Sequence, residues 1–470
     1  KENWDYTVDM IQCRLFSSFY LPLFVGKITG EYMTVYEKGY TKEELEQTAS
    51  ETNRQFVEKL REKYGTPLYV MDQKLIEDNL QKYKEYFVSD KFATQVIYAT
   101  KAFLNVGMCQ LVNKFGLGMD AVSDGELFTI KHSGFPMENV YMHGNNKSDL
   151  ELEMCIDYGV GVIIVDNFYE LKRLEKICEL KNKKVKALLR VNPGIEAHTH
   201  EYIKTSKDSS KFGETIYEDK IYDIIEEFQK SEYVELLGFH CHIGSQIFDT
   251  KAFYAEIETM MDFIEAVKEK LSFHTKYLNL GGGFGIYYVS GDKELNIPEV
   301  MKKMIEILEN KLEEYNISLE KVIIEPGRSI VGNAGTTIYT VGGTKITHSG
   351  KKYVFVDGGM ADNIRPALYQ AEYEGCIANK MNDKISDEVT VAGKCCESGD
   401  MLIKDYLMAE AEAGDILAVS TTGAYNYSMA SNYNRLRKPA VVLVKDGQSK
   451  LLVRRETYED LIRTDMNFED

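Results

Sequence analysis

From about residue 95 to residue 327 the chain repeats one pattern, in which a short apolar run is followed by a longer amphipathic stretch. Short, nearly continuous apolar strands that alternate with helices indicate parallel strands buried on both faces. Eight such runs in succession favour a (β/α)8 TIM-like barrel over an open doubly wound sheet. The runs are QVIYATK (95–101), GLGMDAV (116–122), VYMHG (140–144), GVIIVD (161–166), KALLRV (186–191), LLGFHCH (236–242), YLNLGGG (277–283) and VIIEPG (322–327).

The pattern changes after residue 330, where β-rich runs such as KKYVFVDGG and AVVLVKDG are separated by short turns with little helix. This favours an antiparallel β-sandwich or barrel domain, which the early strand PLYVMD (67–72) is expected to join. We therefore predict four segments. They are an N-terminal, partly helical extension of unknown function (1–63), a strand of the β domain (64–74), the barrel (75–330) and the β domain (331–470). Met33 is a candidate alternative start.

The composition limits the class of partner. A formal net charge of −18 argues against nucleic-acid binding, because phosphate backbones are bound by basic surfaces. No apolar run reaches the roughly 20 residues that span a bilayer, and the acidic start does not match a secretory signal. The eight cysteines follow no disulfide or metal spacing, so we expect reduced thiols and a cytoplasmic protein.

Polar and glycine residues cluster where the predicted strands end. The C-terminal strand ends of a barrel form one face, and that face contains the active site. Residues that are scattered along the chain are therefore expected to converge there. They are Lys101, Asp120, His143, Asp166, Arg190, His240, His242, Gly281, Gly282, Gly283, Glu325 and Arg328.

Three of these strand ends suggest a bound aldehyde cofactor that carries a phosphate. Lys101 at a barrel mouth can form a Schiff base with an aldehyde, although a strand-end lysine is more often only solvated. The glycines 281–283 follow the seventh strand, where barrels commonly bind phosphate through backbone N–H groups. Glu325 could keep a pyridine nitrogen protonated, and Arg328 could hold a phosphate or carboxylate. A turn and a surface ion pair are the ordinary alternatives.

Further candidates lie on both sides of residue 330. His240 and His242 alternate, and one could stack on a cofactor ring; a metal site is the other reading, but no matching carboxylate or cysteine spacing supports it. Cys395 and Cys396 precede Glu397, so a neutral thiol could donate a proton and the glutamate could recognise a substrate cation. The polar set is completed by Arg365, Tyr369 and Tyr425.

Eleven ordered motifs between about residues 64 and 445 give the chain a specific resemblance to a known family. They are YGTPLYV, YATKA, GLGMDAVSDGEL, HGNNKS, VNPG with HTHEYI and SKFG, GFHCHIGSQ, LNLGGGFG, IIEPGR, DGGMADNIRPALY, CCESGD and TTGAY. This set resembles the fold-type III pyridoxal-phosphate-dependent decarboxylases, and among them the members that act on meso-2,6-diaminopimelate. The resemblance implies formation of L-lysine and CO2, the last step of lysine biosynthesis.

The resemblance also implies a role for each matching residue. Lys101 would hold pyridoxal 5′-phosphate covalently, His242 would stack on its ring and Glu325 would pair with its nitrogen. The other residues expected to bind the cofactor are Asp120, Ser245, Gly281, Gly282, Gly283, Pro326, Gly327, Arg328 and Tyr425. Those expected to bind the substrate are Arg328, Arg365, Tyr369, Glu397 and Tyr425. Cys396 would reprotonate the product carbon, and because the family takes its CESGD loop from the partner subunit, a homodimer with shared sites is expected.

Two departures and three alternatives remain. The segment KTSKDSSKFG (204–213) lacks the glycine that is usual after HTHEYI. A second cysteine, Cys395, precedes the expected proton donor; alignment of the following ESGD with the family's motif identifies Cys396 as the donor. The first alternative is a sister decarboxylase of ornithine, arginine, lysine or carboxynorspermidine, which more often carries Asp at the position of Glu397. The second is a non-catalytic pyridoxal-phosphate protein, which would lack the β domain. The third is a metal-dependent barrel hydrolase that uses His240 and His242.

Overall fold

The computed structural model of the chain describes residues 42–195 and 210–468. The chain divides into two compact units, of which one comprises residues 78–286 and 293–330 and the other comprises the rest. We call them the barrel unit and the β unit. Met33, the HTHEYI segment and residues 204–209 of the segment that follows it lie outside the described residues.

The barrel unit is a closed ring of parallel strands, which confirms the predicted (β/α)8 architecture. Each strand pairs with its neighbour, β10 pairs with β2, and β5 pairs with β6, so the ring has no open edge. Each of the eight apolar runs overlaps a strand of the ring. The strands are β2 (Ala93–Tyr98), β3 (Gly118–Ala121), β4 (Val140–Met142), β5 (Val162–Val165), β6 (Val185–Asn192), β8 (Val234–His240), β9 (Tyr277–Asn279) and β10 (Lys321–Ile324). A two-residue strand, β7 (Glu214–Thr215), pairs with β6 outside the ring.

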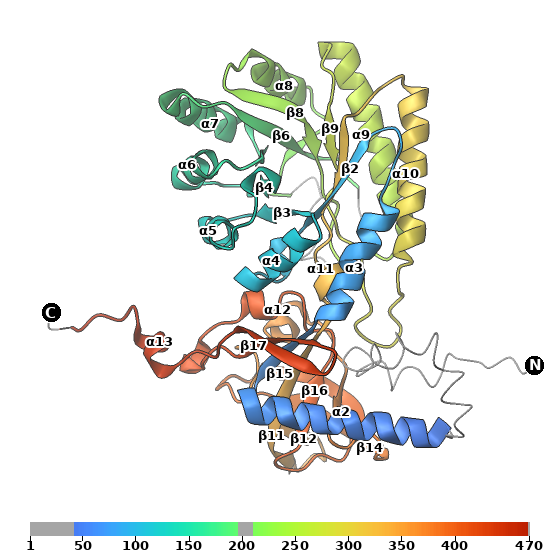
Figure 1. Cartoon of the computed structure of the whole chain (residues 1–470), viewed down its shortest axis with the longest axis vertical. Helices are drawn as coiled ribbons and strands as arrows, with labels where there is room; N and C mark the ends of the chain where they lie inside the picture. Colours follow the sequence, from blue (N-terminus) through green and yellow to red (C-terminus); the bar gives the residue numbers. More distant parts are fainter. Residues whose placement is uncertain (1–41, 196–209, 469–470) are drawn as a thin grey trace, which may run out of the picture. The chain divides into compact units, whose positions relative to one another are not determined.

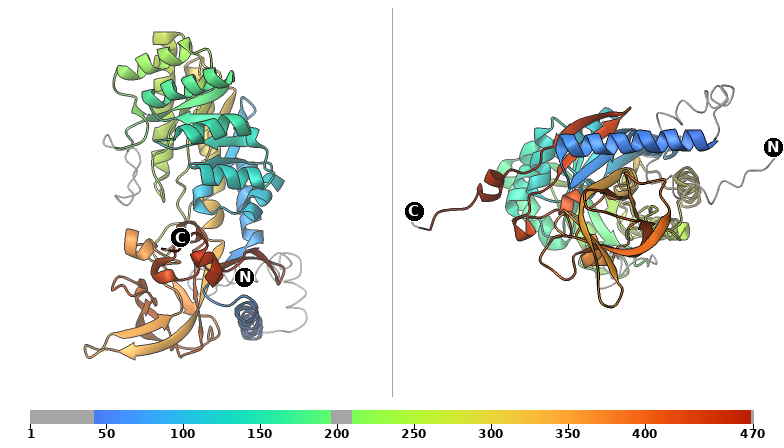
Figure 2. Two further views of the ribbon diagram at one scale, coloured as in Figure 1. Left: turned by 90° about the vertical axis from the view of Figure 1, so that its left-hand side faces the viewer. Right: turned by 90° about the horizontal axis from the view of Figure 1, so that it is seen from below.

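Helices cover the outside of the strands (Figures 1 and 2). Several begin at a side chain that caps the first free backbone N–H groups; Ser148, for example, forms a reciprocal capping box with Glu151 at the start of α6. The outer helices are α3 (Gln73–Tyr86), α4 (Val106–Lys114), α5 (Asp124–His132), α6 (Asp149–Tyr158), α7 (Phe168–Lys181), α8 (Lys220–Lys230), α9 (Thr250–Leu271) and α10 (Ile297–Glu314). The four-residue helix α11 (Arg328–Val331) follows β10 and is buried.

An apolar layer from six strands fills part of the barrel. Its buried members come from β2, β4, β5, β6, β8 and β10, and the layer includes Ile97, Tyr141, Ile164, Leu188 and Ile323. Large and branched side chains of this kind make the interior of such a barrel a packed core rather than a channel. The polar strand ends therefore rest on a rigid base.

The β unit contains a nine-stranded sheet that is mostly antiparallel, as expected, and β1 joins it from the N-terminal side by pairing with β11. Two pairs, β1 with β17 and β12 with β14, are parallel, which the sequence analysis did not predict. The strands are β1 (Leu68–Asp72), β11 (Gly335–Ile346), β12 (Lys352–Val356), β13 (Gly375–Ile377), β14 (Ile385–Ala392), β15 (Met401–Ala409), β16 (Ile416–Val419), β17 (Ala440–Lys445) and β18 (Gln448–Val453).

Helix α2 (Lys42–Tyr64) accounts for the described part of the N-terminal extension. Its buried residues Phe56, Val57 and Leu60 belong to the same apolar cluster as Leu68 and Val70 of β1. This helix therefore contributes to the core of the β unit. Two short helices complete the unit, α12 (Arg365–Tyr369) and α13 (Tyr458–Ile462). Within the described residues, no helix combines the length and the apolar character needed to cross a membrane.

Candidate active site

Lys101 lies just beyond the end of a barrel strand. Strand β2 ends at Tyr98, and Lys101 is the exposed middle residue of a short 3-10 turn whose neighbours Thr100 and Ala102 are buried. The side chain was expected at the strand end itself, and the structure places it in the turn that follows. The buried neighbours fix the backbone of this turn, and the Lys101 side chain itself is exposed.

Asp120 fixes this turn. It is buried at the end of β3, and its Oδ1 accepts hydrogen bonds from the backbone N–H of Thr100 at 2.6 Å and from the Thr100 hydroxyl at 3.0 Å. Burial raises the pKa of the Asp120 carboxyl and Glu325 raises it further, while His143 and Lys101 act in the opposite direction. Asp120 thus holds the turn that carries Lys101.

Glu325 is the centre of a buried polar cluster at the end of β10. Its Oε1 lies 2.8 Å from His143 Nε2 and accepts a hydrogen bond of 2.7 Å from Asn279 Nδ2. Its Oε2 lies 3.4 Å from His240 Nε2, and the rings of His143 and His240 meet edge to face with centroids 4.7 Å apart. Four strand ends, those of β4, β8, β9 and β10, therefore meet at one carboxylate.

The charge of this carboxylate follows from its neighbours. Burial on its own would raise the pKa of Glu325, but His143 and His240 outweigh it and hold the pKa well below its usual range. Burial lowers the pKa of His240 to about 3, so that its ring is neutral. Glu325 is therefore a buried anion, which is the state needed to face a positively charged N–H group.

The same cluster bears on the metal alternative. One ligand atom from each of His143, His240 and Glu325 lies within 4.8 Å of the others, so the carboxylate that the sequence analysis found missing is present. The predicted pair was incomplete, because His143 and not His242 is the second histidine of this group. Oε1 of this carboxylate already contacts His143 and Asn279, as expected for an anion that the protein holds by hydrogen bonds and not for a metal ligand.

His242 lies beside the glycine loop. Its Nδ1 accepts a hydrogen bond of 3.3 Å from the backbone N–H of Gly282. Burial is the first cause that lowers the pKa of His242 well below its usual range, with Lys101 and Arg190 adding to it. A neutral imidazole can stack on a flat aromatic ring without the repulsion that a second positive charge would cause.

Each glycine of residues 281–283 is needed where it stands. A Cβ on Gly281 would lie 2.6 Å from the carbonyl oxygen of Cys241, one on Gly282 would lie 2.1 Å from that of Glu325, and one on Gly283 would lie 2.3 Å from that of Gly244. Gly281 and Gly283 also have positive φ angles of 63° and 104°. The loop is a backbone cradle that only glycine can form.

Other predicted cofactor residues lie in the same unit. Arg328 Nη2 donates a hydrogen bond of 3.1 Å to the hydroxyl of Ser245. The carbonyl oxygen of Pro326 accepts a hydrogen bond of 3.1 Å from the backbone N–H of Ala99, which joins β10 to the Lys101 turn. A Cβ on Gly327 would lie 2.7 Å from that of Ala99, so this junction is closely packed.

The β unit carries the remaining candidates. Arg365 begins α12 and is buried, and its Nε donates a hydrogen bond of 2.9 Å to the hydroxyl of Tyr373. Its guanidinium carbon lies 5.3 Å from the ring centroid of Tyr369 and 5.4 Å from that of Tyr425, which has a positive φ of 65°. The structure therefore brings together three residues that were predicted to bind the substrate, with the two tyrosine rings beside the Arg365 guanidinium.

The two adjacent cysteines differ in exposure. Cys395 is buried, its backbone N–H donates a hydrogen bond of 2.8 Å to Asp400 Oδ2, and burial raises the pKa of its thiol to about 11. Cys396 and Glu397 are exposed on the loop that follows. The backbone N–H of Cys396 donates a hydrogen bond of 2.7 Å to Asn434 Oδ1. The loop is thus anchored by Asp400 on one side and by Asn434 on the other.

Sequence reasoning missed several of these partners. Asn279 holds Glu325, Tyr373 holds Arg365, and Asp400 holds the cysteine loop. An asparagine inside the apolar run YLNLGGG was a usable signal, because a polar side chain in a buried strand needs a partner. Tyr373 and Asp400 offered no such signal, since both lie in polar loops.

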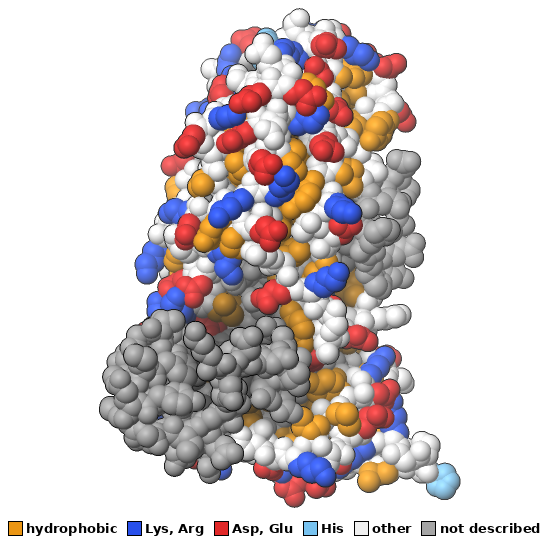
Figure 3. All heavy atoms as spheres, turned by 90° about the vertical axis from the view of Figure 1, so that its right-hand side faces the viewer, with side chains coloured by type: hydrophobic (Ala, Val, Ile, Leu, Met, Phe, Trp, Pro, Cys, Tyr) orange, Lys and Arg blue, Asp and Glu red, His pale blue; other side chains and the backbone are white. Residues whose placement is uncertain are grey.

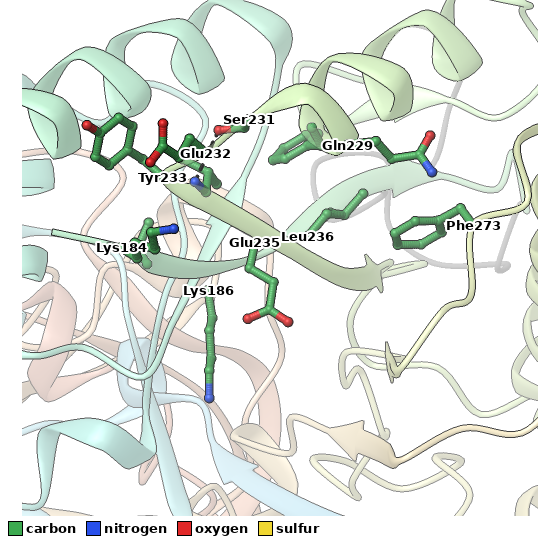
Figure 4. Close-up of a pocket in the computed structure, with 12 residues that line it drawn as sticks. Lys184, Lys186, Gln229, Ser231, Glu232, Tyr233, Glu235, Leu236 and Phe273 are labelled. Carbon is green, nitrogen blue, oxygen red and sulfur yellow. Dashed lines mark hydrogen bonds between the residues drawn. The ribbon is translucent and has the colours of Figure 1, made fainter.

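A separate hollow lies at the opposite end of the barrel strands. It has a volume of about 470 Å³ and is lined by residues at the beginnings of β6 and β8, with Phe228, Leu236 and Phe273 among its apolar members (Figure 4). Figure 4 shows Lys184 and Lys186 on one side of it. None of the predicted site residues lines this hollow.

Residues 73–332 match the family model described as "Pyridoxal-dependent decarboxylase, pyridoxal binding domain". The chain is 50% identical to the diaminopimelate decarboxylase of Bacillus subtilis (strain 168), over 87% of this chain and 93% of that relative. Two similar solved structures are diaminopimelate decarboxylases with L-lysine bound. The structure from M. jannaschii is 34% identical (TM-score 0.80) and that from Helicobacter pylori is 30% identical (TM-score 0.79). The two matches cover 87% of this chain and 94% and 98% of those chains.

The residues present fit the cofactor of this family. The glycine cradle leaves room that a Cβ would fill, the buried anion of Glu325 suits a ring N–H, and the amine of Lys101 is accessible. The barrel, the site geometry and the relatives all lead to the same assignment. The chain belongs to the pyridoxal-dependent decarboxylases, within the diaminopimelate decarboxylase family.

Proposed function

We propose that this protein removes one carboxylate from meso-2,6-diaminopimelate and forms L-lysine and CO2, the last step of lysine biosynthesis. The buried Glu325 carboxylate carries the proposal, since it is held as an anion among strand ends next to the Lys101 turn. When bound, pyridoxal 5′-phosphate supplies an electron sink for the electron pair of the broken carbon–carboxylate bond. Two relatives that are 50% and 48% identical in sequence, both named diaminopimelate decarboxylase, support the choice of substrate.

In the barrel unit, each residue has one task. Lys101 holds the cofactor through its side-chain amine. Glu325 holds a proton on the ring nitrogen, and His143 and Asn279 keep that carboxylate in place. His242 stacks as a neutral ring, and the Gly281–Gly283 cradle binds the phosphate through backbone N–H groups. Ser245, the Gly327-Arg328 turn and Asp120 complete the proposed cofactor site.

In the β unit, Arg365 and Tyr369 bind a substrate carboxylate, and Tyr425 lies at the same cation. Cys396 donates a proton to the carbon that has lost its carboxylate. The exposure of Cys396 supports this choice over the buried Cys395. Glu397 recognises the distal ammonium group of the substrate.

We also propose a cytoplasmic homodimer in which the Cys396–Glu397 loop of one subunit completes the site of the other. The loop carries its reactive groups on the surface of the single chain, which suits such sharing. The seven cysteines within the described residues are free thiols, as expected in a reducing compartment.

The proposed partners are small amino acids and not nucleic acids. On the face drawn in Figure 3, acidic and basic side chains are interspersed among the described residues. This face therefore presents no broad positive region of the kind that phosphate backbones require.

The role of Lys101 is tested by Lys101→Ala. The variant is expected to lose both turnover and the absorbance of the lysine-bound cofactor, whereas the exposed control Lys114→Ala should keep both. Full turnover with retained absorbance in Lys101→Ala would disprove the assignment.

The substrate is tested by a panel with product chromatography. The panel contains meso-diaminopimelate, its two enantiomeric forms, ornithine, arginine and lysine. We expect turnover of the meso form to L-lysine, and faster turnover of ornithine or lysine would instead identify a sister decarboxylase. Glu397→Gln is expected to raise KM for meso-diaminopimelate more than it lowers kcat, while the exposed control Glu388→Gln should change neither.

The shared site is tested by mixing inactive subunits. Lys101→Ala and Cys396→Ala are each expected to be inactive or strongly impaired. Free exchange would place one intact site in half of the dimers, so mixing should restore roughly a quarter of wild-type activity if subunits share sites. No recovery, with exchange shown by mass spectrometry, would mean that each site belongs to one chain.

A further inference from the structure

The β unit contains a cavity that the proposed function does not use. Its volume is about 240 Å³, and its wall combines four basic side chains with two acidic ones. The charged residues are Lys394, Arg435, Arg437, Arg455, Asp357 and Asp362. All lie in the β unit, on segments that are distant in the sequence.

The two acids are already engaged by the protein. Asp357 Oδ1 accepts from the backbone N–H of Thr340 at 2.9 Å, and its Oδ2 accepts from the Thr66 hydroxyl at 2.6 Å. Asp362 accepts from a backbone N–H and from a tyrosine hydroxyl, and burial raises its pKa to about 7. Neither acid forms an ion pair with the basic residues of the wall, and Asp362 carries less than a full charge near neutral pH.

Most of the basic residues lack a matching carboxylate. Arg435 pairs with Asp465 at 2.8 Å. The neighbouring Arg454 also has a carboxylate partner, Asp460. Among the described residues, however, no carboxylate lies within 4.0 Å of the charged nitrogens of Lys394, Arg437 or Arg455. Three cations thus line one small cavity without an ion pair to a carboxylate, beside the two acids of its wall, Asp357 and Asp362.

The contacts that these arginines do make leave donors available. Arg437 Nη1 donates a long hydrogen bond of 3.4 Å to the carbonyl oxygen of Glu456, and its guanidinium lies over the Tyr458 ring at 4.6 Å. Arg455 donates through Nη2 to two backbone carbonyl oxygens, and its Nε and Nη1 have no partner among the described residues. Burial and then the nearby Arg437 lower the pKa of Arg455, while Asp357 and Asp362 act in the opposite direction.

We propose that this cavity binds a small tetrahedral oxyanion, either inorganic phosphate or the phosphate group of a small monoester. Guanidinium forks match the oxygens of phosphate in pairs, and a lysine adds a point charge. An anion at this place would remove the repulsion between Arg437 and Arg455 and would occupy the available donors. The site is distinct from the glycine cradle, which belongs to the barrel unit.

The cavity is connected to the cysteine loop through a strained turn. Asn434 and Arg435 both have positive φ angles, of 51° and 57°, which non-glycine residues rarely adopt. Asn434 Oδ1 accepts the hydrogen bond from the Cys396 backbone N–H, and Lys394 lies two residues before Cys396. An anion bound by Lys394 and Arg437 would therefore fix both sides of the loop. Its effect on turnover rests on the proposed role of Cys396, whereas its binding does not.

The test uses the holoenzyme, dialysed into a phosphate-free buffer, so that the barrel cradle is already filled by the cofactor's phosphate. Inorganic phosphate is titrated by calorimetry and by melting temperature, with sodium chloride keeping the ionic strength constant. We expect a saturable heat and a saturable rise in melting temperature, because a ligand that binds only the native state stabilises it. Glycerol 3-phosphate is titrated in parallel, and the tighter of the two ligands identifies the free ion or the monoester as the natural class.

Two variants remove charge from the wall. Arg437→Gln and Lys394→Gln are each expected to weaken phosphate binding by about tenfold or more, the value of one charge-assisted hydrogen bond. The control Arg463→Gln removes the same charge from an exposed position of the β unit and should bind phosphate normally. If Arg437→Gln fails to fold by circular dichroism, Lys394→Gln decides alone.

Three results would overturn the proposal. They are the absence of any phosphate response in the wild type, an equal response to chloride at the same ionic strength, and an unchanged phosphate affinity in the folded variants. Normal substrate turnover in the variants would not support the proposal, because the proposal is tested by phosphate binding and not by activity. Likewise, a failure of the proposed decarboxylase activity leaves the phosphate measurement valid.

Discussion

His143 Nε2 lies 2.8 Å from Oε1 of Glu325, and both side chains are buried. The histidine follows β4 and the glutamate follows β10, so the contact joins two strand ends that are 182 residues apart in the sequence. His143 touches no proposed reacting atom. Its position makes it a positioning residue for the carboxylate that faces the cofactor nitrogen.

His143→Asn is therefore expected to lower kcat by about 10- to 100-fold, since hydrogen bonds to charged groups are worth about 1.5–3 kcal/mol. KM should change less, and the absorbance of the bound cofactor should shift, because the acid near the ring nitrogen is held less well. Asn279 still holds Glu325, so activity is reduced and not abolished. Steady-state kinetics and absorbance check this, with exposed His132→Asn as the control. An unchanged spectrum with lower stability alone would mean a purely structural role.

Gly282→Ala is expected to destabilise the barrel unit and weaken cofactor binding. The new Cβ would meet the carbonyl oxygen of Glu325 at 2.1 Å, and strain of this kind costs about 1–3 kcal/mol. Urea unfolding and cofactor titration measure the two effects. Gly125→Ala is the matched control, because its Cβ would meet only Ser123 at 3.9 Å in the first turn of α5, and its stability should be unchanged or slightly higher. Equal behaviour of the two variants would argue against the cradle.

The two cysteines should separate function from stability. Cys396→Ala is expected to lower kcat by about 10²- to 10⁴-fold, the usual range for loss of a general acid. Cys395→Ala is expected to keep most turnover but to lose about 1 kcal/mol of stability, because its side chain is buried. Single-variant kinetics and urea midpoints distinguish them. A larger loss of kcat in Cys395→Ala than in Cys396→Ala would mean that Cys395, and not Cys396, is the proton donor.

Glu256 gives a prediction about pH. It is buried on α9, its Oε1 lies 3.2 Å from the Cys241 thiol, and burial raises its pKa to about 8. The native state therefore keeps a proton that the unfolded chain loses above its ordinary pKa of about 4.3. Stability from this group is full below that pH and is lost as pH rises through about 8. Glu256→Gln should remove this loss.

The measurement compares urea midpoints of Glu256→Gln and wild type at pH 5 and pH 8.5. The variant's relative stability should be higher at pH 8.5 than at pH 5. The control is Glu258→Gln, an exposed residue of the same helix, whose difference from wild type should be independent of pH. A pH-independent difference for Glu256→Gln as well would mean that the native carboxyl is ionised.

The barrel was predictable because its strands are short apolar runs whose burial on both faces leaves a clear pattern, as in VIIV of β5. The convergence of Lys101 and Glu325 followed from barrel geometry alone. Which strands pair in the β unit was harder to predict. The alternation of apolar and polar residues indicates which face of a strand is buried, but not which strand lies beside it. The parallel pairs β1–β17 and β12–β14 therefore had no local signal in the sequence. Tyr373 beside Arg365 was also missed, because a loop tyrosine gains its role only from a tertiary neighbour.

The hydrogen bond between Ala99 and Pro326 lies where the last strand of the barrel meets the first. The turn with Lys101 and the carboxylate of Glu325 therefore become neighbours only when the ring closes, which requires contacts between residues at the two extremes of the barrel sequence. Such long-range contacts are slow to form, because the chain between them must lose entropy before the contact is gained. Acquisition of the cofactor would then report that a newly made chain has closed its barrel.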